Sequence, residues 1–437
     1  MEQILLTGIF MFALFFLLGS GVWVGLSLLG VALIGMELFT NRPAGDAMIT
    51  TIWTSSSSWT LTALPLFIWM GEILFRTRLS EDMFRGLAPW MANLPGRLLH
   101  SNIVGCAVFA AVSGSSAATV TTVGKMSIPE LRRRGYPERM IIGTLAGAGT
   151  LGLLIPPSLT LIVYGVTINE SITKLFIAGV VPGIVLAMLF MGYVAGWSFV
   201  RKSEVPPPEP KMSFGEKIRE SRFLIPVMLL VVSVIGSMFL GWATATEAAS
   251  FGVVGSLVLA AAQGSLNRET FLTSLMGAVR TSAMIALILA GASFLSLSMG
   301  FTGLPRALAE FIATLQLSPV ALIVALTLFY IVIGCFLDGI SSVVLTMAVV
   351  EPMIRQAGID VIWFGIFIVV VVEMAQITPP IGFNLFVLQG MTEHQINYIA
   401  LAALPLFLLM VVMVGLLVAF PELALWLPEQ VRDAPGG

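Results

Sequence analysis

Charge is scarce in this chain of 437 residues: Asp, Glu, Lys and Arg make up 11% of it, whereas soluble proteins carry about 25%. Five runs contain no charged residue and no histidine: residues 4–36, 140–167, 175–200, 223–246 and 281–305. Each run reaches the roughly 20 apolar residues with which a helix crosses the bilayer core. The composition therefore excludes a cytosolic enzyme, and the lack of a basic stripe excludes a nucleic-acid binder.

Cysteine is also scarce, and alternating strand patterns are absent. Cys106 and Cys335 both lie inside apolar segments, which favours small buried residues and excludes a disulfide scaffold. Strands of a β-barrel would show alternations of about ten residues instead of unbroken apolar runs. The N-terminus has no basic region of the kind that precedes a cleaved signal peptide, so we expect the first span to be retained. The sequence predicts an all-α polytopic membrane protein.

The apolar segments predict about 11 transmembrane helices together with two re-entrant hairpins, at 98–124 and 318–350. The spans are expected near 4–19, 21–39, 58–75, 140–167, 175–200, 223–243, 247–263, 280–300, 361–390 and 396–420. Amphipathic pieces are expected at 80–93 and 304–315. A polar, proline-rich connector at 201–210 lies near the middle of the chain and interrupts the helical pattern.

The two halves of the chain read as a repeat. A shift of 223 positions without a gap aligns Pro156-Pro157 with Pro379-Pro380 and also superposes four other identical residues between positions 129 and 170. Proline pairs are rare inside membrane spans, so the shared register indicates internal duplication. If both hairpins return to the side from which they came, seventeen of the 22 Lys and Arg residues lie on one side, which is therefore predicted to be cytoplasmic. This arrangement makes the repeats inverted and places both termini in the periplasm.

Residues 109–124 combine three serines, three threonines and two glycines in a segment at lipid depth. Glycine permits a tight turn, and hydroxyl groups satisfy backbone groups that a break in a helix releases. A half-helix starting there would aim its amide groups at an anion, and exposed carbonyls would bind a small cation. The alternative is a closely packed helix face whose hydroxyls bond to their own helix.

Each half also carries a proline pair inside an apolar segment, at 156–157 and 379–380, where a helix must unwind. A simple kink is the alternative, but broken helices at matching positions in two halves indicate a binding site at the membrane midplane. The repeat pairs Ser115 with Asp338, an acid in an otherwise apolar hairpin. Asp338 is either a functional group or an inert cap of a half-helix. Glu72, Glu247 and Glu373 are weaker candidates.

These segments resemble the large, DctM-like membrane subunit of tripartite ATP-independent periplasmic (TRAP) transporters. The resemblance is carried by Ala111–Ser116, Ile128–Glu130, Gly149–Gly152, Ile155–Ser158, Phe336–Asp338, Thr378–Pro380, Phe383–Phe386, Phe420–Leu423 and Leu425–Pro428. It implies import of a small organic anion, a carboxylate or an acidic sugar, across the bacterial inner membrane with Na⁺ as coupling ion. It also implies an elevator mechanism, a separate four-helix membrane subunit and a periplasmic substrate-binding protein. No enzymatic activity is expected.

The resemblance also suggests a division of the chain and a set of site residues. The division is scaffold helices at 1–57, a first repeat at 58–200, a cytoplasmic linker at 201–222, a second repeat at 223–420 and a tail at 421–437. One Na⁺ is expected near Ser113, Gly114, Ser115, Ser116, Gly149 and Thr150, and another near Asp338, Gly339, Ser341, Ser342 and Thr378. The substrate is expected near Ser116, Thr119, Pro157, Ser158, Pro380 and Asn384.

Three other functions remain open at this point. An intramembrane hydrolase would use Ser115 as nucleophile with His100 or His394 as base, although the spacing favours neither histidine. A stand-alone anion symporter or antiporter would work without a binding protein, and coupling to protons would require Asp338 or Glu373 to titrate. A passive channel is disfavoured because two occluding hairpins suit a gated site better than an open pore.

Overall fold

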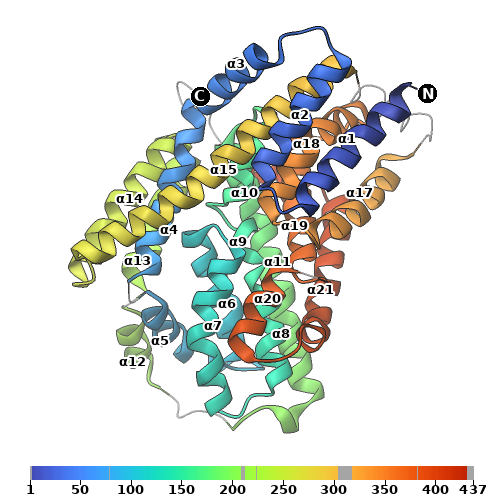
Figure 1. Cartoon of the computed structure of the whole chain (residues 1–437). Helices are drawn as coiled ribbons and strands as arrows, with labels where there is room; N and C mark the ends of the chain where they lie inside the picture. The colour runs from blue at the N-terminus through green and yellow to red at the C-terminus, as the bar shows by residue number, and fades with distance from the viewer. Residues whose placement is uncertain are drawn as a thin grey trace.

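The chain folds into a bundle of helices in a computed structural model that describes residues 2–77, 79–207, 212–222, 224–303, 317–380 and 382–430. Within these ranges the regular elements are all helices, as the sequence predicts (Figure 1). Among the described residues, five helical segments are long and apolar enough to cross a membrane, or up to seven if each of two bent pairs counts as one span. The predicted amphipathic piece at 304–315 lies outside the described residues.

The N-terminal helices are short and separated by defined breaks. The first two are α1 (Glu2–Gly19) and α2 (Val24–Phe39), and the predicted break between them contains Gly21 at φ 83°. A helix that we did not predict, α3 (Ala44–Ser56), precedes α4 (Ala63–Phe75), with a bend of 58° between them. Serines fill the sequence at this bend, so the chain carried no long apolar run to reveal α3.

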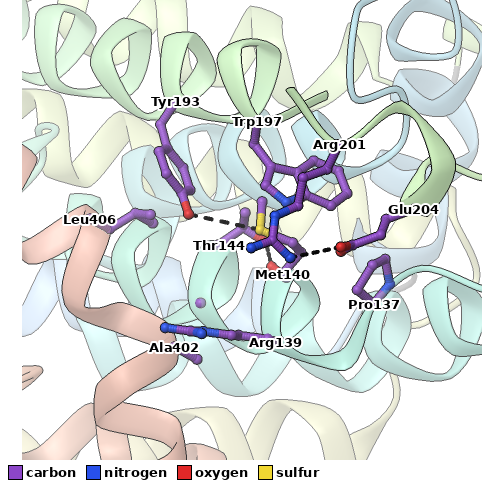
Figure 2. A pocket seen from close by; sticks show the side chains of 11 residues that line it. Pro137, Arg139, Met140, Thr144, Tyr193, Trp197, Arg201, Glu204, Ala402 and Leu406 are labelled. Carbon is purple, nitrogen blue, oxygen red and sulfur yellow. Dashed lines mark hydrogen bonds and ion pairs between the residues drawn. The ribbon is translucent and has the colours of Figure 1, made fainter. Parts of the chain in front are cut away.

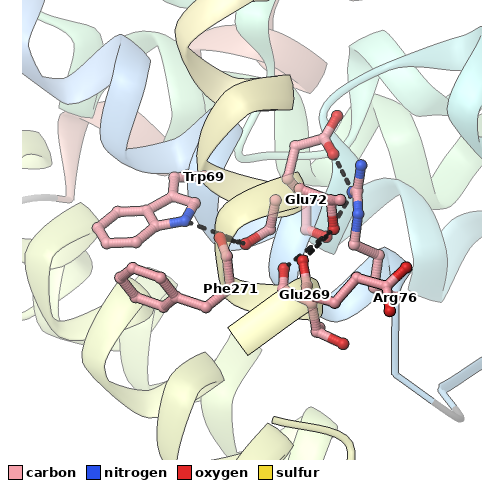
Figure 3. A network of polar contacts seen from close by, with 8 residues as sticks. Trp69, Glu72, Arg76, Glu269 and Phe271 are labelled. Atoms are coloured by element: carbon pink, nitrogen blue, oxygen red, sulfur yellow. Dashed lines mark hydrogen bonds and ion pairs between the residues drawn. The ribbon is translucent and has the colours of Figure 1, made fainter. Parts of the chain in front are cut away.

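Two helices of the second half, α14 (Ala245–Ala262) and α15 (Arg268–Thr302), pack with these N-terminal helices, and α13 (Ile225–Phe239) packs against α14. The helix α15 begins twelve residues before the predicted span at 280 and packs along α2, α3 and α4. Figure 3 shows the contact with α4, where Trp69 Nε1 donates to Ser274 Oγ at 3.4 Å and its ring meets Phe271 edge-on. Glu72 forms an ion pair with Arg76 in the same region.

Both predicted hairpins are present, each as two helices joined by a short break. The first consists of α6 (Leu99–Ser113) and α7 (Ser116–Arg133), and the second of α17 (Pro319–Gly334) and α18 (Gly339–Gln356). The helices α7 and α18 begin and end at positions separated by the same 223-residue shift, so the backbone follows the register of the repeat. In Figure 1 the first hairpin lies in the lower half of the molecule and the second in the upper half.

Both proline pairs interrupt helices, which excludes a simple kink. In the first half α8 (Glu138–Gly149) and α9 (Leu151–Leu154) lead to the break, and α10 (Leu159–Ile168) follows it. In the second half α19 (Val361–Gln376) ends before the break and α20 (Phe383–Thr392) begins after it. Both breaks contain a cis Pro–Pro bond.

The remaining helices surround this central group. They are α5 (Leu79–Met91), α11 (Ile172–Val200), α12 (Phe214–Ser221), α21 (Ile396–Ala419) and α22 (Glu422–Glu429). The amphipathic α5 confirms the piece predicted at 80–93, and it pairs with α12 inside the proposed linker through Trp90 Nε1, which donates to Ser221 Oγ at 2.6 Å. In the proposed tail, α22 packs against α11. Both cysteines are free and buried.

Candidate functional site

The tip of the first hairpin is built from a left-handed glycine and a serine cap. Gly114 ends α6 at φ 59°, a conformation that favours glycine. Ser115 is the N-cap of α7, and its hydroxyl accepts from the backbone N–H of Ala118 at 3.5 Å. Ser113 Oγ and Thr119 Oγ1 lie 2.9 Å apart across the tip. The hydroxyls of this segment therefore organise a break in the helix, as the hairpin interpretation requires.

This first tip rests on broken helices from both halves of the chain. A Cβ atom at Gly152 would lie 2.7 Å from the backbone nitrogen of Ser116, so only glycine leaves room for the tip. On its other side, Ser116 Oγ donates to Glu373 Oε1 of α19. The tip also meets the first proline break, because the backbone N–H of Leu159 donates to Gly114 O at 3.4 Å.

The tip of the second hairpin has a related construction with a carboxylate as the cap. Asp338 Oδ2 accepts from the backbone N–H groups of Ile340 at 3.1 Å and Ser341 at 3.2 Å. Asp338 therefore caps α18, which is the alternative that we set out for it. The residue is also exposed. Cys335 Sγ donates to Pro379 O at 3.4 Å, so this tip also touches the proline break of its own half.

Several buried polar groups around the two tips have no hydrogen-bond partner in the part of the chain that the structure describes. They are Glu373 Oε2, Gln376 Nε2, both amide atoms of Asn384, and the hydroxyls of Thr160, Ser341 and Ser342. Buried polar groups are normally paired, since leaving one unpaired costs about 1–3 kcal/mol. Asn384 Nδ2 lies 3.9 Å from the point where a Cβ atom on Gly149 would lie. Thr160 Oγ1 lies 3.9 Å from the corresponding point on Gly339. These groups are suited to face a polar or ionic ligand.

The predicted residues divide into those that the fold brings together and those that it separates. Residues 113–116, Thr119, Pro157 and Ser158 meet at the first tip, where Ser158 caps α10 by accepting from Leu161 N at 3.2 Å. Thr150 turns away, because its hydroxyl donates to Gly147 O at 2.6 Å and lies beside Met410. Thr378 Oγ1 donates to Met374 O of its own helix at 2.7 Å.

The sequence reasoning undervalued Glu373 and did not single out Gln376. Both lie on α19 and are buried, and the repeat pairs Glu373 with Thr150. A signal was available, because Glu373 is the one charged residue between Asp360 and Glu393. Of the other two weak candidates, Glu72 pairs with Arg76, and Glu247 closes a capping box with Thr244 at the start of α14.

Neither histidine lies beside Ser115, as a hydrolase would need. His100 Nε2 is 2.6 Å from Pro95 O near the start of α6, and the rise along α6 separates it from the tip by about 20 Å. His394 Nε2 is 3.3 Å from Glu138 Oε1, and its ring stacks on Tyr398. The Ser115 hydroxyl serves instead as a helix cap.

Comparison with known proteins gives one consistent family. Residues 10–423 match the model of the tripartite ATP-independent periplasmic transporter, DctM component. The C4-dicarboxylate TRAP transporter large permease protein DctM of Pseudomonas aeruginosa is 31% identical, with 86% of this chain and 88% of that protein covered. The sialic acid TRAP transporter large permease protein SiaM of Vibrio cholerae is 29% identical, with 94% and 96% covered.

Two further similarities extend this comparison. The isethionate TRAP transporter permease protein DctMQ of Oleidesulfovibrio alaskensis is 30% identical over 91% of this chain, which spans only 62% of that protein. Among solved structures, that of Neisseria gonorrhoeae MtrF, described in a study of antimetabolite efflux pumps, aligns with a TM-score of 0.51 at 11% identity. The alignment covers 87% of this chain and 83% of MtrF and supports the fold alone.

Proposed function

Since the chain belongs to the DctM component family of TRAP transporters, a large permease subunit of the inner membrane that imports substrate with a binding protein, we propose that it imports a small organic anion with sodium. Family membership implies two partners, a small membrane subunit and a periplasmic binding protein. The relatives' names mention a C4-dicarboxylate and sialic acid, which both carry a carboxylate, and isethionate, which is a sulfonate anion. A carboxylate or acidic sugar is therefore the proposed substrate class.

The residue types at the two tips favour the binding of a substrate anion together with bound cations. No Lys or Arg occurs in the tips at 113–119 and 335–342 or in the breaks at 155–158 and 377–384. The substrate charge would therefore be met by the amide ends of the half-helices and by bound Na⁺. Sodium prefers several oxygen ligands, which the serine hydroxyls, the backbone carbonyls and the carboxylates of Asp338 and Glu373 supply. We include Glu373 among the proposed ligands because its carboxylate lies at the first tip, where it accepts from Ser116.

The single observation that carries this proposal is the set of unpaired polar groups around the tips. Glu373 Oε2, Gln376 Nε2 and both amide atoms of Asn384 are buried without a partner on two helices that border the first tip. Buried polar groups are normally paired, so this cluster beside the first tip favours a ligand there. We place Na⁺ against the hydroxyls and carboxylates, and the substrate anion against the Asn384 amide and the helix ends.

We further propose that the two hairpins and two broken helices move together as an elevator. The central group makes the contacts between the tips and the breaks, whereas α2, α3, α4, α14 and α15 pack mainly on one another, as a stationary scaffold would. The two groups meet where α4 contacts α6 and α10 and where α15 contacts α18. The predicted chain divisions, the cytoplasmic side and the inverted orientation of the repeats belong to this proposal. The location of the two hairpins in opposite halves of the molecule supports it (Figure 1).

Transport in proteoliposomes tests the proposed function directly. Vesicles would contain this chain and its small membrane partner, and organic acids would be offered with the cognate binding protein, with or without an inward Na⁺ gradient. We expect uptake only when both the binding protein and the gradient are present. Uptake without the binding protein would support the stand-alone symporter instead, and uptake driven by a proton gradient alone would contradict sodium coupling.

A further inference from the structure

A cavity of about 250 Å³ lies away from the hairpin tips, where the ends of α8, α11 and α21 meet. Figure 2 shows its polar side chains, Arg139 from α8, and Arg201 with Glu204 from the residues just after α11. Met140, Leu406 and Ala402 form the apolar wall. The volume exceeds the roughly 30 Å³ that one water occupies in the liquid several times over, so a molecular group fits here.

The polar groups of this cavity suit a phosphate. Arg201 Nη1 donates to Glu204 Oε1 at 2.7 Å, and Arg139 Nη2 donates to Leu401 O at 3.2 Å, which leaves most N–H groups of both guanidinium groups available. The Tyr193 hydroxyl has only a long contact of 3.9 Å to the sulfur of Met140. Two arginines and a phenol hydroxyl around one space form a site for a group with several acceptor oxygens.

The surroundings of the cavity identify a membrane lipid as the source of the phosphate. The cavity lies near the ends of three apolar segments that are long enough to span the membrane: the broken segment Glu138–Ile168, α11 and α21. Tyr193 and Trp197 line it, and these residue types gather at the membrane–water interface. Phe199, Val200 and Leu401, which adjoin the lining residues Arg201 and Ala402 in the sequence, are more than half exposed, so acyl chains would find an apolar surface there.

From these observations we infer that the cavity binds the phosphate of an anionic membrane lipid, with Arg139 and Arg201 as the cationic ligands. Basic pockets between membrane helices on the cytoplasmic side recognise such headgroups, and this is the side on which most Lys and Arg residues are predicted to lie. Glu204 competes with the lipid for Arg201. The bound lipid would join the start of the first broken helix to the ends of α11 and α21.

Native mass spectrometry of the complex with the small subunit tests this inference. The detergent-solubilised complex would receive equal amounts of phosphatidylglycerol and phosphatidylcholine with identical acyl chains. We expect phosphatidylglycerol to be retained preferentially. The variant Arg139→Gln/Arg201→Gln should bind it about thirtyfold more weakly, with about fivefold from each arginine. Arg268→Gln, a matched exposed arginine at the start of α15, should bind it like the wild type.

The variant Glu204→Gln separates anion binding from a merely structural role of Arg201. Removal of the competing carboxylate should strengthen phosphatidylglycerol binding by a few fold, whereas a structural ion pair would give unchanged or weaker binding. Equal retention of both lipids, or retention by the double variant at the level of Arg268→Gln, would overturn the inference. Displacement of the lipid by millimolar glycerol 3-phosphate would also overturn it, because the site would then take a soluble phosphate compound.

Discussion

The two hairpin tips occupy equivalent positions in the repeat but differ in their surroundings. In the first half Ser116 is 5% exposed and lies between Gly152 and Glu373, and the adjoining Pro156-Pro157 break is buried. In the second half Phe336 is 62% exposed, and Asp338 and the Pro379-Pro380 break are also exposed. One tip is thus closed against its neighbours within the chain, while the other is open.

The residues that differ between the halves explain this asymmetry. Gly152, on which the first tip rests, corresponds to Ala375 in the second half, and Ser116 corresponds to Gly339. The carboxylate of Glu373 holds the first tip, whereas Gly339 offers no side chain for such a bond. A shared backbone register therefore fixes where the helices break, and a few side chains decide how tightly each tip is held.

The largest effect is expected from filling the space beneath the first tip. Gly152→Ala places a methyl group 2.7 Å from the backbone of Ser116 and must displace the tip. Displacement of a site by about 1 Å can cost about a hundredfold in rate, so we expect sodium-driven uptake to fall by that order. Gly196→Ala is the control, since a Cβ there meets open space. Normal uptake by Gly152→Ala, at equal membrane insertion, would contradict the close contact.

The carboxylate that holds the first tip should have the next largest effect. Glu373→Gln keeps the shape of the side chain but removes its charge, and loss of a charged hydrogen bond should lower sodium-driven uptake by about ten- to a hundredfold. Ser116→Ala should act in the same direction. Glu247→Gln, which alters an exposed capping box in α14, serves as the control. A Glu373→Gln variant that transports like Glu247→Gln would exclude Glu373 from the site.

A smaller effect is expected at the open tip. Asp338→Asn preserves a helix cap but removes the charge, and we expect the Na⁺ concentration for half-maximal uptake to rise about tenfold, as for other weakened ion sites. Asp360→Asn is a matched control, because Asp360 caps α19 by accepting from Ile362 N and Trp363 N. If the two variants show the same Na⁺ dependence, Asp338 is only a cap.

The asymmetry itself can be measured by thiol labelling, with the smallest expected difference. In a background with Cys106 and Cys335 replaced by alanine, Phe336→Cys at the open tip should react several times faster with a water-soluble maleimide than Ser113→Cys. Ser113 is half-buried and corresponds to Phe336 in the repeat. Equal labelling rates would show that the two tips are equally accessible, and the comparison between them would fail.

Much of the fold was predictable because it depends on local chemistry. The unbroken apolar runs predicted membrane helices, and the shift of 223 residues predicted the matching bounds of α7 and α18. The helix α3 was missed because its threonines and serines show no apolar run. The start of α15 was placed too late because Arg268 and Glu269 open a helix that extends beyond its apolar part.

The candidate site was predictable only where one segment determines it. Sequence reasoning set out a helix cap as one alternative for Asp338, since a short polar side chain before a half-helix can accept from its first amides. It expected Ser115 and Ser158 as ligands of the ion and the substrate, and only the structure shows that both are caps. Sequence reasoning ranked Glu373 low, because the partner of Glu373 is Ser116, 257 positions away in the chain. The orientation of Thr150 away from the tip also follows from packing against α21.

The sequence by itself determined that this protein is a duplicated bundle of membrane helices with breaks at Gly114 and at two proline pairs. The physical reason is that bilayer length, the missing N–H of proline and the freedom of glycine act within a few residues. Only the tertiary structure decided that Glu373 holds the first tip, that the second tip is exposed and that two arginines border one cavity. These features arise where distant helices meet, and their contacts depend on how the whole bundle packs.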